Sequence, residues 1–96
     1  MTPDEEIRRG RHAANVLDDE IYKEAYQSIR ERIVGQLASA DLSDDKRDRL
    51  NNLLIALEAV RRYMEQVMVG GRMAVEQIER ERTMTQRIGD RLRATM

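Results

Sequence analysis

The chain has no cysteine, tryptophan or phenylalanine, and only one proline among its 96 residues. Without cysteine there can be no disulfide framework and no thiolate metal site. Its three tyrosines are the only aromatic residues, so apolar packing must come from Leu, Ile, Val, Met and Ala, a set that suits helix-on-helix packing. Few aromatic side chains also mean that less apolar area is buried per residue. Self-association is expected to bury the further area that a stable fold needs.

Charge of one sign and long apolar runs are also lacking. Basic residues number 17 and acidic residues 18, which gives a net charge of −1, whereas a dedicated nucleic-acid-binding protein is usually basic. No run of about 18 apolar residues occurs, and the N-terminus lacks the apolar centre of a signal peptide. The composition predicts one soluble cytoplasmic domain over residues 1–96, with no membrane contact.

The first residues carry a helix start signal. Thr2 can cap a helix, Pro3 fits its first turn, and Glu5 completes a capping box. We therefore predict an N-terminal helix over residues 3–17, within a weaker segment 1–18. Gly10 and a thin apolar face weaken this helix.

A second helix is predicted over residues 19–39, where apolar residues at steps of three and four form one stripe. A turn follows, in which Asp41 or Ser43 can cap the next helix. This turn is the corner of a predicted helical hairpin, with residues 19–39 antiparallel to the helix that follows.

The third segment has the most regular pattern. A heptad seam, meaning apolar or small residues at alternating steps of three and four, runs through Leu50, Leu53, Leu57, Val60, Met64, Val67, Gly71, Ala74 and Ile78. Because a broken helix has no reason to resume in register, the seam predicts one helix over residues 43–82 or beyond, with a turn at residues 69–72 as the alternative. Residues 83–96 are charged on all sides and are expected to fray.

The predicted helices differ in length. A helix of about 40 residues spans roughly 60 Å, and residues 19–39 span roughly 30 Å, so the shorter helix covers only half of the longer one. An exposed apolar stripe of this kind marks an interface. We therefore predict an all-α homo-oligomer, with a compact monomer that turns at Gly70 as the alternative. Its interface would comprise Met64, Val67, Gly70, Gly71, Ala74 and Ile78.

No pattern of catalytic residues is present. His12 is the only histidine, and its place on a charged helix is typical of solvated surface. There is no glycine-rich phosphate loop and no nucleophile paired with a base. The sequence predicts no enzyme activity, no cofactor and no metal. Arg8, Arg9 and Arg11 could contact phosphates, although acidic neighbours favour a charge-balanced helix face.

Two parts of the sequence resemble a known group of proteins. These are Asp18–Tyr26 followed by Ser43–Leu50, and Leu57–Gly71 leading into Ala74–Glu79. They resemble small helical proteins encoded in the structural gene clusters of tailed phages and prophages. The resemblance covers about residues 8–82, rests on helical pattern, and carries no functional residues. It implies a setting of virion assembly or DNA packaging.

The resemblance gives three hypotheses. In the leading one, a non-enzymatic protein self-associates and docks on capsid, portal or packaging proteins, in an infected or lysogenic bacterium or on the virion. In the second, it is a DNA-binding packaging adaptor similar in role to a small terminase subunit, which a salt-sensitive shift of DNA would indicate. In the third, it blocks a host defence factor, which a co-purifying host protein would indicate.

Overall fold

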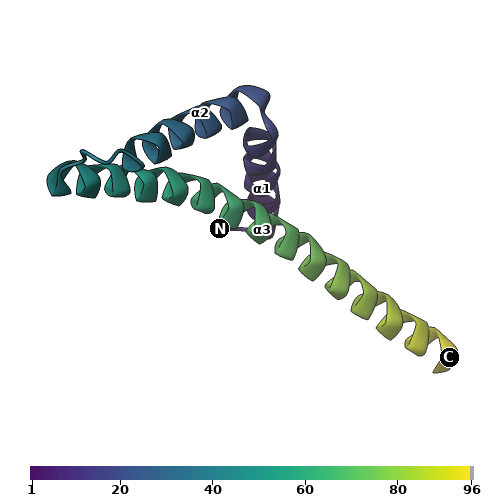
Figure 1. Ribbon diagram of the computed structural model, residues 1–96. Helices are drawn as coiled ribbons and strands as arrows, with labels where there is room; N and C mark the ends of the chain where they lie inside the picture. Colours follow the sequence, from purple (N-terminus) through teal and green to yellow (C-terminus); the bar gives the residue numbers. More distant parts are fainter. Residues whose placement is uncertain (96) are drawn as a thin grey trace.

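The computed structural model describes residues 1–95, and these residues form three helices and no strand (Figure 1). Helix α1 spans Pro3–Asp18, α2 spans Glu20–Leu37 and α3 spans Asp44–Thr95. The prediction of an all-α fold with one long helix is confirmed. Each observed helix begins at, or one residue after, its predicted start.

Side-chain caps define the three helix starts. The caps Thr2, Asp19 and Ser43 each accept a hydrogen bond from the backbone N–H three residues further on, at 3.2, 2.8 and 3.3 Å. These bonds satisfy amides that have no partner in the first turn of a helix. Asp19 also ends α1, so one residue separates α1 from α2.

Helix α3 runs without a break through Gly70 and Gly71 and continues to Thr95. Its 52 residues correspond to about 78 Å, and the longest dimension of the molecule is 82 Å. The alternative of a turn at residues 69–72 is therefore wrong. Residues 83–95 are helical, and Met96 lies outside the described residues.

The helices outline an open triangle with α3 as its extended base (Figure 1). From the corner at residues 38–43, α2 and α3 diverge at an angle. Helix α1 is joined to the far end of α2 and crosses α3 near its middle. Accordingly, α1 packs more extensively on α3 than α2 does. The predicted corner is present, but an antiparallel hairpin with α2 along α3 is not confirmed.

The course of α1 explains why α2 diverges. Its 16 residues are about 24 Å long, and α1 crosses α3 steeply instead of lying along it (Figure 1). The end of α1 at Asp18 consequently stands away from α3. Because only Asp19 lies between the two helices, α2 must also begin away from α3.

Few side chains are removed from solvent. The buried apolar residues are Ala13, Tyr26, Ile33, Leu50 and Ala74, and none of the side chains of residues 1–95 is completely enclosed. The radius of gyration is 22.3 Å, against about 12–13 Å for a compact domain of this length. The packed regions are thus confined to the corner, the contact of Tyr26 with α3 and the crossing of α1 with α3.

Candidate interaction surface

Two glycines form the crossing between α1 and α3. Gly10 and Gly71 are both buried. A Cβ atom added to Gly10 would lie 2.8 Å from the Cα of Gly71, and one added to Gly71 would lie 2.9 Å from the Cα of Gly10. Carbon atoms pack at about 3.5–4.0 Å, and backbone atoms cannot rotate aside. The two helices therefore meet at a spacing that any side chain at either position would disrupt.

Small residues extend this contact on both helices. Ala13 of α1 and Ala74 of α3 are only 7% and 3% exposed. Between α1 and the part of α3 that precedes the crossing lies a groove, lined by Arg8, Arg9, His12, Ala13, Val16, Tyr63, Met64 and Val67. Its lining combines apolar side chains with the basic side chains of Arg8 and Arg9.

The six residues predicted to form an oligomer interface lie in different environments in the structure. Gly71 and Ala74 lie beneath α1 of the same chain, so α1 occupies the surface that a partner would need. Gly70 faces open space, with nothing within 4 Å of an added Cβ. Gly70 is half-buried, as are Met64, Val67 and Ile78. The close approach expected at Gly71 is observed with α1 instead of a second copy, and self-association stays a prediction.

Other apolar residues of the seam have no cover. Before the crossing, Leu53 and Val60 are 56% and 59% exposed. After it, Ile88 and Leu92, which continue the seam, are 57% and 58% exposed. The exposed part of the seam therefore lies on both sides of α1, along one long unbroken helix.

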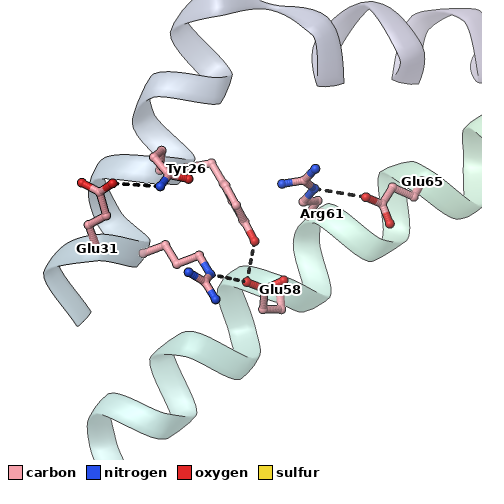
Figure 2. Close-up of polar contacts among 7 residues, drawn as sticks. Tyr26, Glu31, Glu58, Arg61 and Glu65 are labelled. Carbon is pink, nitrogen blue, oxygen red and sulfur yellow. Dashed lines mark hydrogen bonds and ion pairs between the residues drawn. The ribbon is translucent and has the colours of Figure 1, made fainter. Parts of the chain in front are cut away.

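One polar cluster joins α2 to α3 (Figure 2). The hydroxyl of Tyr26 donates a hydrogen bond to Oε1 of Glu58, and Nε of Arg30 lies 3.4 Å from the same oxygen. The guanidinium of Arg61 lies over the Tyr26 ring, 4.8 Å from its centroid, and Nε of Arg61 pairs with Glu65 at 3.1 Å. This cluster holds α2 against α3 beyond the corner.

The same cluster shifts two ionisation equilibria. The hydrogen bond to Glu58, with burial as a second cause, raises the pKa of Tyr26 above its ordinary value of 10.0. That bond, helped by the charge of Arg30, lowers the pKa of Glu58 below its ordinary value of 4.5, although partial burial opposes it. Both shifts arise because the bond favours a neutral phenol and a charged carboxylate. At neutral pH the cluster is therefore a structural contact between fixed charge states.

The arginines proposed to contact phosphate lie on α1. Arg8, Arg9 and Arg11 are exposed, and no carboxylate in the described part of the chain forms an ion pair with them. Arg9 donates a hydrogen bond to the hydroxyl of Tyr63 on α3 at 3.4 Å. Phosphate contact stays a prediction.

Two other kinds of site are absent from residues 1–95. In this range no three or more His, Asp or Glu side chains gather where they could hold a metal ion, and none of the helices has the length and hydropathy to cross a membrane. A scan against protein-family models, a search of curated proteins and a search of solved structures found no match.

Two of these contacts were not predicted from the sequence. Gly10 was expected only to weaken α1, yet it is the contact point with α3. A signal was available, because Gly10, Ala13 and Ala14 place small residues on one face at helical spacing. The bond from Tyr26 to Glu58 joins residues 32 apart, and no local pattern marks it.

Proposed function

We propose that this chain is a non-catalytic helical protein that assembles with copies of itself along the seam of α3. One observation carries the proposal. The accessible surface is 8068 Å² for a chain of 11.2 kDa, whereas a compact monomer of that mass exposes about 5,700 Å². The excess of roughly 2,400 Å² is larger than the total of about 1,600 Å² that a standard interface buries. A partner of similar length is needed to cover it.

The exposed seam indicates where that partner packs. Leu53 and Val60 precede the crossing, and Ile88 and Leu92 follow it, all at heptad spacing on one helix. This spacing is the pattern by which two helices interlock side chains in a coiled coil. A second copy carries the same pattern over the same length, so it offers a complementary surface without a further component.

The setting of the assembly is part of the proposal. The resemblance over residues 8–82 supports a role in virion assembly in a tailed phage or prophage. There the assembled helices would dock on capsid, portal or packaging proteins. The elongated shape, 82 Å in its longest dimension, suits contact with several subunits of a larger structure.

A pair of matched variants tests the proposal by sedimentation equilibrium. We expect the wild-type chain to be oligomeric at micromolar concentration and Val60→Glu to be monomeric, because association would bury an unpaired carboxylate. Ile55→Glu is the control. Ile55 is 66% exposed and Val60 59% exposed on the same helix, but Ile55 lies off the seam.

In solutions dilute enough that both variants are single chains, helix content measured by circular dichroism should be equal in the two, since both side chains face solvent in the single chain. The proposal fails if the wild-type chain is a monomer at high micromolar concentration. It also fails if Ile55→Glu weakens association as much as Val60→Glu does.

A further inference from the structure

We infer that α1 is a displaceable cover, and that the α3 helix of a second copy replaces it on Gly71 and Ala74 when the chain assembles. The inference rests on the proposed function and names the surface that assembly requires. The seam is exposed at Val60 before the crossing and at Ile88 after it. At Gly71 and Ala74, between these positions, α1 of the same chain lies on the seam. A second α3 cannot follow the seam through this point unless α1 leaves.

The contact of α1 with α3 is the most extensive between helices in the structure, but its fully buried part is small. Its buried residues are Gly10 and Ala13, which have little or no side chain to pack. Among residues 1–95, no ion pair joins α1 to α3. The side-chain hydrogen bond between the two helices, from Arg9 to Tyr63, is 3.4 Å long and exposed. Half-buried apolar side chains such as Ile7 and Val16 flank the contact, and at its centre it depends on a close backbone fit that weakens when the helices separate by a small distance.

The connection to α2 leaves α1 able to move as a unit. Asp19 is the single residue between the helices, and α1 has few contacts with α2. The ion pair across this junction, from Lys23 to Asp18 at 2.9 Å, joins largely exposed side chains. Rotation about the backbone of Asp19 would therefore swing α1 away with both helices intact.

A second α3 offers the seam larger partners than α1 does. Against Met64, Val67 and Ile78, which are half-buried in the single chain, it would place seam side chains of the same kind. Gly71 and Ala74 would let the two α3 backbones approach closely, as Gly71 already does with Gly10. The same small residues thus serve the covered and the assembled states, and the two states compete for them.

Gly10→Ala tests the competition without changing any residue of α3. The new Cβ would lie 2.8 Å from the backbone of Gly71 and would push α1 off the seam. Gly35→Ala is the matched control, because an added Cβ at this helical glycine of α2 meets nothing within 4 Å. Each change adds one alanine to a helix, so the two share the gain in helix propensity.

Self-association is measured by sedimentation equilibrium. We expect Gly10→Ala to tighten self-association about tenfold relative to Gly35→Ala. Equal or weaker association of Gly10→Ala would overturn the inference, because α1 would then belong to the assembled form.

Hydrogen exchange on the wild-type chain gives a second, variant-free measurement. We expect amides of α1 to exchange faster as the protein concentration rises and α1 is displaced. Slower exchange of α1 on association would overturn this inference and leave the proposed function intact. If all three proteins stay monomeric at every concentration, the proposed function fails and this inference fails with it.

Discussion

Gly10 and Gly71 have no side chains to hold their helices apart, and this defines the character of the contact between α1 and α3. Such a contact gains dispersion energy from many backbone atoms in register. It gains little from apolar burial, because a buried methylene contributes about 0.8 kcal/mol and a whole Leu or Ile side chain about 1.5–3 kcal/mol. The crossing is therefore specific in geometry and modest in strength.

The bond between Tyr26 and Glu58 makes the packing of α2 on α3 dependent on pH. The pKa of Tyr26 is raised, so its stabilisation is fully present below pH 10.0 and is lost as the pH rises further. The pKa of Glu58 is lowered, so its stabilisation is present above pH 4.5 and is lost as the pH falls below that value. We expect the thermal midpoint to be level between these limits and to fall on both sides, as measured by circular dichroism.

Tyr26→Phe is the control for this pH dependence. It keeps the ring beneath Arg61 and removes only the hydroxyl. The midpoint of Tyr26→Phe should be a few degrees lower at neutral pH and should lose the fall that sets in above pH 10.0. An unchanged alkaline fall would show that other groups cause it.

At the scale of the element, α3 extends well beyond the part that α1 and α2 contact. The residues from Glu79 to Thr95 are exposed, except for the half-buried Gly89. The hydrogen bonds that Thr83 and Thr85 make run to carbonyls one turn back on α3 itself. A helical segment of this length without tertiary contacts is marginal in water. We expect the packing of a second copy to stabilise it.

Hydrogen exchange along α3 checks this expectation. In dilute solution, we expect amides of residues 79–95 to exchange close to the rate of an unfolded chain. Amides of residues 64–74, beneath α1, should exchange far more slowly and serve as the internal reference. As concentration rises, exchange over residues 79–95 should slow because a second copy packs against them. Rapid exchange at every concentration would mean that this end of α3 lies outside the interface.

Helix α2 shows how a connection can override a local pattern. Its apolar stripe predicts packing along α3, yet Ile21 and Ile29 are 70% and 46% exposed. Near the corner, Ile33 is buried as expected. The difference follows from Asp19, which ties the start of α2 to the end of α1 that stands away from α3.

At the scale of the whole molecule, shape and surface give one conclusion. The extents of 82 × 25 × 20 Å describe a rod with a triangular head, and a shape of this kind cannot enclose many side chains. Conformational entropy opposes folding by roughly 1–2 kcal/mol for each ordered residue. The few buried residues of this chain must balance it, so added burial by association would contribute directly to stability.

Stability should therefore depend on protein concentration. When folding and assembly are coupled, each tenfold rise in concentration favours the associated state by about 1.4 kcal/mol. For a domain of this size, we expect the thermal midpoint to rise by a few degrees per decade. Val60→Glu, as the non-associating variant, should show a lower and constant midpoint. A constant wild-type midpoint would contradict the coupling.

The positions of the helices could be predicted from local features of the sequence. Local signals suffice for this, since the caps at Thr2, Asp19 and Ser43 act on amides within three residues. The heptad register predicted that α3 crosses Gly70 and Gly71 without a break, and the structure confirms it. Register is a property of one helix and can be read without knowing its neighbours.

Which helix packs on the seam depends on the tertiary structure and could not be predicted from local sequence. The sequence predicted that α2 covers the first half of α3 and that a second copy covers the rest, whereas α1 crosses the seam through Gly10 and Gly71. That pairing depends on the direction of α1, which the single residue Asp19 sets. An apolar stripe indicates that a helix packs against another surface. It does not identify that surface, because the hydrophobic effect is not directional. The fit of two glycine backbones, 61 residues apart in the chain, supplies the missing specificity.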